Sequence, residues 1–488
     1  MTDLVVVGGG ISGLAAGWEA MRRGADVLVL EADDRPGGKL HTSPFAGVPL
    51  DEGADAFLAR VPEAVELCQE VGLGDDLVTP TSGSAYVFSE QALRRLPAEQ
   101  LLGVPTDLDA VAEAGILSAA GLARARDDLA APDDNPGGDE AVGALVRRRL
   151  GDEVLDRLVG PLVGGTWAAD CDRLSLQTAT PALAAARDAD ASLVRGAARV
   201  RAEAGASAGE SPVFLAPRGG MSRLVGTLAE ALGDRLRTGT AVSSVVREGS
   251  RWRVEPAGIT CDGLVLATPA FVTASLVADV APEASQLLAG LDHASVVLVS
   301  LALPRAAIDH PLDGSGFLVP RTAGRVVTAC SWVNSKWGHL DIDPDLAVLR
   351  VSAGHDGDER AARADDDQLL AATLVDLREL MAVDPGAAPV QVRISRWLRA
   401  FPQPRPGHAA RVRGIDAALR RGGERLAAAG AWRFGVGIPA CIRAARIALD
   451  GALPDDVTPA RGRPDTARPA IAPDSHPGET PGRPAGSS

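Results

Sequence analysis

Apolar runs separated by glycine-rich and polar stretches predict alternating strands and helices from the start of the chain. Residues 4–7 form a short, uninterrupted apolar run, and residues 26–30 contain a second one. Both have the length of a strand, and the segment between them opens after a cluster of glycines and is expected to be helical. The first 31 residues therefore predict a strand, a helix and a second strand.

Similar patterns continue through the middle of the chain. Residues 139–150 have the period of an amphipathic helix, with Val142, Leu145, Val146 and Leu150 on one side. Further strands are expected at residues 291–303, 315–320, 325–333, 346–353 and 390–395, with a helix at 366–381. This order predicts a mixed sheet with covering helices.

The turn after the first strand carries a G-x-G-x-x-G pattern. Gly8 allows a tight turn, Gly10 lets the backbone approach a pyrophosphate, and Gly13 lets the helix pack closely on the strand. The N–H groups and dipole at the helix N-terminus favour that anion. Glu31 ends the second strand, 18 residues after Gly13, where a carboxylate accepts hydrogen bonds from ribose hydroxyls. Together these features predict an adenine dinucleotide site, and the acid disfavours the 2′-phosphate of NADP.

Composition excludes several other classes of function. The net charge is −15, from 49 Lys and Arg against 64 Asp and Glu, so nucleic acid would be repelled. The five cysteines are scattered and the histidines form no metal-binding pattern, so we expect no disulfide, zinc or iron–sulfur site. No apolar run reaches the roughly 18 residues that a transmembrane helix needs, and no signal peptide precedes the first strand. These features predict a cytoplasmic protein.

The residues that follow Glu31 favour FAD over NAD. Residues 35–39 (Arg-Pro-Gly-Gly-Lys) resemble the R-x-G-G-R segment that follows the ribose acid in flavoproteins of the amine oxidase and protoporphyrinogen oxidase superfamily. Lys39 stands where that superfamily usually has Arg; it keeps the charge, loses the bidentate fork, and is expected to face the cofactor phosphates. Residues 50–58 are similar to the segment beside the isoalloxazine ring.

Three later blocks resemble the same superfamily in the same order. Residues 214–224 match F-x-x-x-x-G-G-M-x-x-L, and residues 265–269 resemble a strand end near the flavin. Residues 432–442 resemble a glycine-rich turn between a strand and the last helix, whose N–H groups suit the pyrimidine oxygens of the flavin. Ala440 replaces the acid that is usual in this turn.

Two further blocks indicate one branch of the superfamily. Residues 151–176 resemble the "G-x-E-V … P-x-x-x-G-I-Y-A-G-D … L-S" segment of the protoporphyrinogen and coproporphyrinogen oxidases, with Thr166, Trp167 and Ala169 in place of Ile, Tyr and Gly. Residues 396–408 resemble the "R-W … A-x-P-Q-Y … G-H" segment of the same enzymes. The chain is similar to this family from residue 1 to about residue 453.

The resemblance implies a set of site residues. Val242 would pack against the adenine, and Arg60 is the candidate partner of a substrate carboxylate, while no residue is singled out as the proton acceptor. The residues expected to contact FAD are Gly8, Gly9, Gly10, Ile11, Ser12, Gly13, Glu31, Ala32, Gly38, Lys39, Gly53, Ala54, Asp55, Ala56, Val242, Trp397, Val436, Gly437 and Ile438.

The implied fold is α/β, with a Rossmann-like FAD-binding domain interleaved with a mixed-sheet substrate domain and a helical domain. The expected ranges are 1–75, 206–275 and 421–455 for the FAD-binding domain, 76–205 for the mainly helical domain, and 276–420 for the substrate-binding domain. Residues 456–488 are rich in proline and poor in large apolar residues, so they are expected to be a disordered tail.

The implied reaction is the oxygen-dependent oxidation of a porphyrinogen in haem biosynthesis. A methylene-bridge hydride passes to the flavin while a pyrrole N–H loses a proton, and O₂ then reoxidises the flavin and yields hydrogen peroxide. Coproporphyrinogen III is the preferred substrate, because the chain resembles the branch of the family found in monoderm bacteria, and protoporphyrinogen IX is the first alternative. An amine oxidase is less favoured, because such enzymes surround the amine with aromatic residues and this chain has one tyrosine, Tyr86.

Other roles and partners stay open at this stage. Polyene desaturation and a non-catalytic flavin-binding role are disfavoured by the porphyrinogen-oxidase blocks and by the complete cofactor cradle. The expected small-molecule partners are the porphyrinogen and O₂. Contact with a membrane surface and transient contact with a ferrochelatase are left open, as is the oligomeric state.

Overall fold

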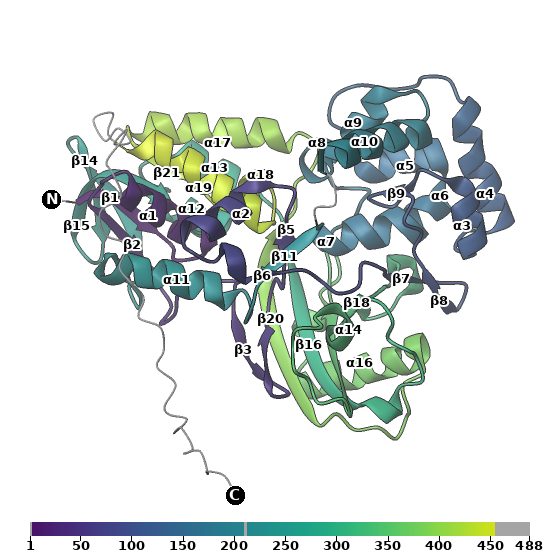
Figure 1. Cartoon of the computed structure of the whole chain (residues 1–488). Coiled ribbons are helices and arrows are strands. Elements are labelled where there is room, and N and C mark those ends of the chain that lie inside the picture. Colours follow the sequence, from purple (N-terminus) through teal and green to yellow (C-terminus); the bar gives the residue numbers. More distant parts are fainter. Residues whose placement is uncertain (1, 209–211, 454–488) are drawn as a thin grey trace, which may run out of the picture.

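The computed structural model describes residues 2–208 and 212–453, and the predicted disordered tail lies outside these residues. Two seven-stranded sheets and a helical lobe meet in the middle of the molecule (Figure 1). The predicted α/β fold class is confirmed. The molecule has one mostly parallel sheet, one mostly antiparallel mixed sheet and a helical part. The domain ranges stay predictions. Within the range expected to be mainly helical, residues 86–95 form two strands of the mixed sheet.

The first sheet is assembled from three distant parts of the chain. Its strand order is β12-β2-β1-β15-β14-β13, and β21 also pairs with β15. The parallel strands are β1 (Thr2–Val7), β2 (Val27–Leu30), β12 (Leu236–Arg237), β15 (Ile259–Leu266) and β21 (Leu426–Ala428). The antiparallel strands β13 (Ser244–Glu248) and β14 (Arg251–Glu255) complete one edge.

Helices cover both faces of this sheet. One face packs against α1 (Ile11–Arg22), α11 (Ser222–Leu232) and α19 (Ile438–Ala452), and the other against α12 (Ala270–Leu276), α13 (Pro282–Ala289) and α17 (His408–Gly422). Leu4 and Val6 of β1 enter the first core, and Val5 and Val7 enter the second. This two-sided burial explains why the first apolar run has no polar interruption.

The second sheet has the order β20-β16-β19-β18-β17-β7-β8. Its strands are β7 (Tyr86–Ser89), β8 (Ala92–Arg95), β16 (His293–Pro304), β17 (Gly316–Leu318), β18 (Val327–Trp332), β19 (Leu346–Ala353) and β20 (Gln391–Pro402). The pairing of β7 with β17 is parallel and the other pairings are antiparallel, so the sheet is mixed, as predicted. Helix α16 (Asp366–Met381) packs on one face and begins with a capping box of Asp365 and Gln368.

The helical lobe forms a separate core on one side of the molecule (Figure 1). Its main helices are α3 (Leu108–Ala114), α4 (Ala119–Arg126), α5 (Val142–Leu150), the π-helix η3 (Leu155–Gly164), α9 (Pro181–Ala189) and α10 (Leu193–Ala208). Helix α5 begins three residues later than expected, because the Asp139 carboxylate accepts hydrogen bonds from Ser175, Gln177 and Gly407 outside the helix.

Short elements complete the junction between the sheets and the lobe. They are β3 (Thr42–Phe45), β4 (Val48–Asp51), β5 (Phe57–Leu58), α2 (Pro62–Glu70), β6 (Leu77–Val78), α7 (Gly165–Trp167), β11 (Phe214–Pro217), η6 (Arg321–Ala323), α14 (Val333–Lys336) and α18 (Ala431–Phe434).

Candidate active site

A cavity of about 930 Å³ joins the two sheets. At one end it is lined by Gly8 and Glu31, which follow the carboxyl ends of β1 and β2. At the other end it is lined by Leu298 and Ser352, on strands β16 and β19 of the second sheet. Ligands of doubly wound sheets bind at the carboxyl ends of the parallel strands, so the first end has the place of a dinucleotide site.

The glycines of the first turn occupy the positions that the G-x-G-x-x-G pattern requires. Gly8 has a φ of 105°, which only glycine adopts without strain. A Cβ at Gly13 would come 1.7 Å from the carbonyl oxygen of Gly8, so helix α1 packs directly on the turn. A Cβ at Gly10 would meet no atom within 4 Å, because Gly10 faces the cavity together with Ile11 and Ser12. The N-terminus of α1 thus offers open space and N–H groups to a pyrophosphate.

Glu31 is buried at the same end. Its Oε2 accepts a hydrogen bond from Gly9 N at 2.5 Å, and its Oε1 accepts one from Asp33 N at 2.9 Å. Ala32 and the half-buried Val242 line the cavity beside it. This end therefore has a carboxylate and an apolar wall, and the roles expected for Glu31 and Val242 stay predictions.

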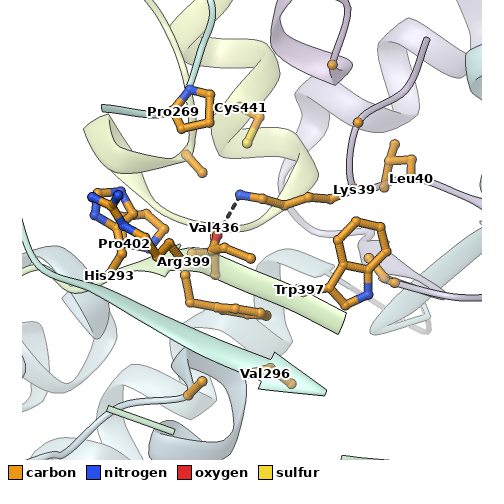
Figure 2. Close-up of a pocket in the computed structure, with 18 of the residues that line it drawn as sticks. Lys39, Leu40, Pro269, His293, Val296, Trp397, Arg399, Pro402, Val436 and Cys441 are labelled. Atoms are coloured by element: carbon orange, nitrogen blue, oxygen red, sulfur yellow. Dashed lines mark hydrogen bonds between the residues drawn. The ribbon is translucent and has the colours of Figure 1, made fainter. Parts of the chain in front are cut away.

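The segment after Glu31 lies beside the glycine turn. Gly37 N donates to the carbonyl oxygen of Gly9 at 2.8 Å, and Gly38 lines the cavity. Lys39 was expected to face the phosphates, but its ammonium donates to the carbonyl oxygen of Ala400 at 2.5 Å and lies beside Cys441 (Figure 2). Burial lowers the pKa of Lys39. Lys39 lines the cavity, and its residue surface is exposed there.

Ion pairs hold Asp55, on the loop between β4 and β5, against α14 and strand β19 of the second sheet. Its Oδ2 is 2.7 Å from Lys336 Nζ and 2.8 Å from Arg350 Nη1, and it accepts a hydrogen bond from Trp337 Nε1 at 3.3 Å. Arg350 also donates to the carbonyl oxygen of Gly53. Burial alone would raise the pKa of Asp55, but the two cations hold it well below its usual range. The second sheet therefore holds the segment of Gly53, Ala54, Asp55 and Ala56 against the cavity.

Trp397 and the start of α19 line the cavity next to this segment. Trp397 Nε1 donates to the carbonyl oxygen of Glu52 at 2.6 Å, which fixes the indole beside Gly53. Gly437 is the N-cap of α19, and its neighbours Val436 and Ile438 line the cavity. The expected strand-to-helix turn is modified, because the short helix α18 lies between β21 and α19. Gly9, Gly13 and Gly437 do not line the cavity themselves but stand next to residues that do.

The glycine block at residues 214–224 supports the cavity from behind. Asp51 Oδ1 accepts hydrogen bonds from Thr42 Oγ1 and from Met221 N, the latter at 2.9 Å. Gly220 has a φ of 93°, and a Cβ there would come 2.5 Å from Thr42. Burial raises the pKa of Asp51 to about 6. This block thus holds the β3–β4 hairpin in place and does not line the cavity.

The two blocks that indicated the substrate come together at the second end of the cavity. Gln403 Nε2 donates to the carbonyl oxygen of Trp167 at 3.0 Å, and Ser175 N donates to that of Pro404 at 2.8 Å. From these blocks, the cavity is lined by Pro161, Gly164, Gly165, Thr166, Ala168, Ala169, Trp397, Leu398, Arg399, Ala400, Phe401 and Pro402. Residues more than 200 positions apart in the sequence therefore form one wall.

Basic residues that no motif revealed also line this second end. They are His293, Arg321, Lys336, Arg350, His355 and Arg399. Arg399 has a φ of 51° at an irregular pairing between β20 and β16, and its guanidinium carbon lies 3.7 Å from the centre of the Phe271 ring. Each is an isolated basic residue in the sequence, so only the fold reveals the group. Arg60, the expected carboxylate partner, is exposed and is not among the residues that line the cavity.

Comparison with known proteins assigns this arrangement to a family. A family model described as flavin containing amine oxidoreductase matches residues 11–449. The chain belongs to this family. FAD is its cofactor, since the family contains flavin and the cavity begins at a dinucleotide turn with room for a pyrophosphate at Gly10.

Several members of the family are similar over most of their length. The coproporphyrinogen III oxidase of Mycobacterium tuberculosis is 37% identical over 456 residues, which cover 92% of this chain and 96% of that protein. The coproporphyrinogen III oxidase of Bacillus subtilis is 30% identical, with 92% of this chain and 97% of that protein covered. A crystal structure from Exiguobacterium sp. 255-15, provisionally named a protoporphyrinogen oxidase, has a TM-score of 0.81 at 30% identity and covers 92% of this chain and 98% of its own.

Residues 2–208 and 212–453 contain no group of His, Cys, Asp and Glu side chains that could hold a metal ion. Over the same residues, no helix has the length and apolar character needed to cross a bilayer.

Proposed function

We propose that this flavoprotein oxidises coproporphyrinogen III to coproporphyrin III with O₂ as electron acceptor, and releases hydrogen peroxide, in haem biosynthesis. The observation that carries the proposal is the second end of the cavity, where six basic residues surround an apolar and hydroxyl-bearing sheet face. That lining suits a large apolar ring with carboxylates at its edge. The names of the similar proteins from Mycobacterium tuberculosis and Bacillus subtilis support the same substrate.

The FAD contacts expected from the sequence are part of the proposal. The N-terminus of α1 would bind the pyrophosphate, Glu31 the adenosine ribose, and Val242 the adenine. The isoalloxazine would then lie at the junction of the two sheets, between the segment 53–56, Trp397 and the start of α19. Space at Gly10 and the N–H groups of two helix N-termini support this placement.

In the proposed reaction the protein mainly orients the substrate and excludes water. FAD, when bound, would accept one hydride from the porphyrinogen in each of three rounds, while one proton leaves per round, and would pass two electrons to O₂ each time. Val296, Leu298 and Val319 supply apolar surface next to the isoalloxazine position. Lys336 and Arg350 keep Asp55 ionised, so the carboxylate stays a hydrogen-bond acceptor at this wall.

The two alternative substrates differ in how they would meet this lining. Protoporphyrinogen IX has two carboxylates where coproporphyrinogen III has four, so fewer of the basic residues would be paired. An amine would place a cation among cations, and the single tyrosine, Tyr86, bonds to Asp313 and does not line the cavity. The charge of the lining therefore favours the substrate with more carboxylates.

Location and further partners belong to the same proposal. All five cysteines are free and buried, which is consistent with a reducing cytoplasm. A ferrochelatase that accepts the product would be a transient partner, because coproporphyrin is released without a metal ion.

A rate assay tests the proposal directly. FAD-loaded protein is mixed with air-saturated buffer and coproporphyrinogen III, and coproporphyrin fluorescence, O₂ uptake and peroxide are followed. We expect turnover with one peroxide per O₂ consumed. Faster turnover of protoporphyrinogen IX would overturn the substrate, and turnover of amines alone would overturn the reaction. A protein that cannot be loaded with FAD would overturn the proposal as a whole.

A further inference from the structure

Four of the six basic residues of the substrate end form two groups along strand β19. The first group is Lys336 and Arg350, which share Asp55. The second is Arg321 and His355, and Arg321 Nη1 donates to the carbonyl oxygen of Asp356 at 3.2 Å. Arg350 and His355 are five residues apart, which is at most roughly 16 Å of extended chain. Arg350 lies within β19, paired with Ser331, whereas His355 follows the end of β19 and Arg321 follows the end of β17, so the two groups occupy successive positions along the strands.

The surface between the two groups carries no charge. It is formed by Leu298, Thr328 and Ser352 on neighbouring strands, with Val319 at the edge. The helical lobe covers it from the other side through Thr166 and Ala168. A flat apolar molecule that rests on this surface would place its edges against the two basic groups.

The two groups differ in how fully their N–H groups are used. Lys336 and Arg350 both contact the Asp55 carboxylate within 2.8 Å. Arg321 has its nearest carboxylate, Asp170, at 3.6 Å, and His355 Nε2 has its nearest, Asp358, at 3.9 Å. Both distances exceed those of a hydrogen bond. Within the described residues, Arg321 thus has Asp170 at ion-pair distance but no hydrogen bond to a carboxylate.

The other acids near the second group already have partners. The Asp356 carboxylate pairs with Arg173 and Arg405, and Asp358 pairs with Arg360. The Arg321 backbone is held at the start of η6, directly after Pro320. Its guanidinium has five N–H groups in a planar fork, of which one is donated to Asp356, so a carboxylate can bind it in two-point fashion.

We propose that Arg321 binds a substrate propionate at the end of the cavity remote from Asp55 and thereby makes the enzyme prefer coproporphyrinogen III to protoporphyrinogen IX. This inference rests on the proposed function. Coproporphyrinogen III carries a propionate on every pyrrole, so its ring presents carboxylates to both basic groups at once. Protoporphyrinogen IX carries propionates on two neighbouring pyrroles, so in either orientation vinyl groups face one of the two basic ends, which costs binding energy.

The test compares both porphyrinogens on the FAD-loaded enzyme. Arg321→Gln removes the charge and Arg321→Lys keeps it without the planar fork. Arg363→Gln is the matched control, because Arg363 is 80% exposed on α15 (Arg360–Arg363) and does not line the cavity. We expect Arg321→Gln to raise KM for coproporphyrinogen III roughly 10- to 100-fold, because the substrate loses a charge-assisted hydrogen bond. The value of kcat should change little. Arg321→Lys should recover part of that loss, and KM for protoporphyrinogen IX should stay within about twofold.

Three results separate the possible failures. If wild-type enzyme oxidises neither porphyrinogen, the proposed function itself fails. If wild-type enzyme is active but Arg321→Gln leaves the ratio of kcat/KM for the two substrates unchanged, this inference fails alone. Should Arg321→Gln lose FAD or fold poorly, Arg321→Lys carries the test, since an unchanged substrate ratio in that variant also overturns the inference. The FAD absorption spectrum of each variant reports whether the cofactor site is intact.

Discussion

Replacing Asp51 with Asn removes one buried charge and leaves its contacts in place. The Asp51 side chain is 7% exposed, and the same oxygen, Oδ1, accepts from both Thr42 and Met221. An Asn can keep that oxygen as the acceptor. The substitution removes the free-energy cost of keeping an ionised carboxylate away from water. That cost is the reason why burial raises the pKa of Asp51 to about 6.

The size of the effect follows from the two pKa values. The ordinary value is 3.8, so between pH 3.8 and 6 the folded protein holds the proton more tightly than the unfolded chain. Wild-type stability from this group is complete below pH 3.8 and is lost as pH rises through 6. A pKa difference of about 2 corresponds to about 3 kcal/mol, of which about 2 kcal/mol is lost between pH 4.5 and 7.5. The Asn variant has no such loss.

Urea unfolding of both proteins, with FAD in constant excess, measures this directly. The free energy of unfolding of Asp51→Asn minus that of wild type should rise by about 2 kcal/mol from pH 4.5 to 7.5. Any change in hydrogen bonding shifts this difference by the same amount at every pH. Asp358→Asn is the control that should show almost no pH-dependent difference over this range, because the hydrogen bond from Arg360 lowers the pKa of Asp358 and its stabilisation is lost only as pH falls below about 3.8. A difference for Asp51→Asn that is independent of pH, or that falls with pH, would refute the reasoning.

Three further predictions concern the cofactor turn, the ion pairs and the thiols. Gly10→Ala should fold normally, since its Cβ meets no atom, but bind FAD at least roughly 10-fold more weakly by fluorescence titration; wild-type affinity would contradict this. Gly13→Ala should fail to fold, because its Cβ would strike Gly8. Lys336→Met should lower the free energy of unfolding by about 2 kcal/mol in urea titration, and equal stability would argue against the Asp55 ion pairs. All five cysteines are buried, and burial raises the pKa of Cys68 to about 12, so a thiol reagent should react with the protein only after denaturation; labelling of the native protein would contradict this.

Local sequence determined the cofactor end of the site. The apolar run at 4–7, the glycines that follow and Glu31 are continuous in sequence, and each requirement acts over a few residues. A tight turn needs glycine at Gly8, and close helix packing needs it at Gly13, whatever the rest of the chain does. The mixed second sheet and the helix at 366–381 also followed from the apolar pattern, because burial on one or two faces leaves a regular pattern.

The place of single charged residues was decided by the tertiary structure. Lys39 follows the glycine turn in sequence, yet its ammonium reaches Ala400, because the β20 backbone crosses the cavity there. Arg60 follows a cofactor segment but points to solvent, while Lys336 and Arg350, about 300 residues from Asp55, reach it across the two sheets. Sequence patterns record which faces are buried, since that depends on neighbours along the chain. They do not record which distant strand supplies the facing charge, because that depends on how the sheets are placed against each other.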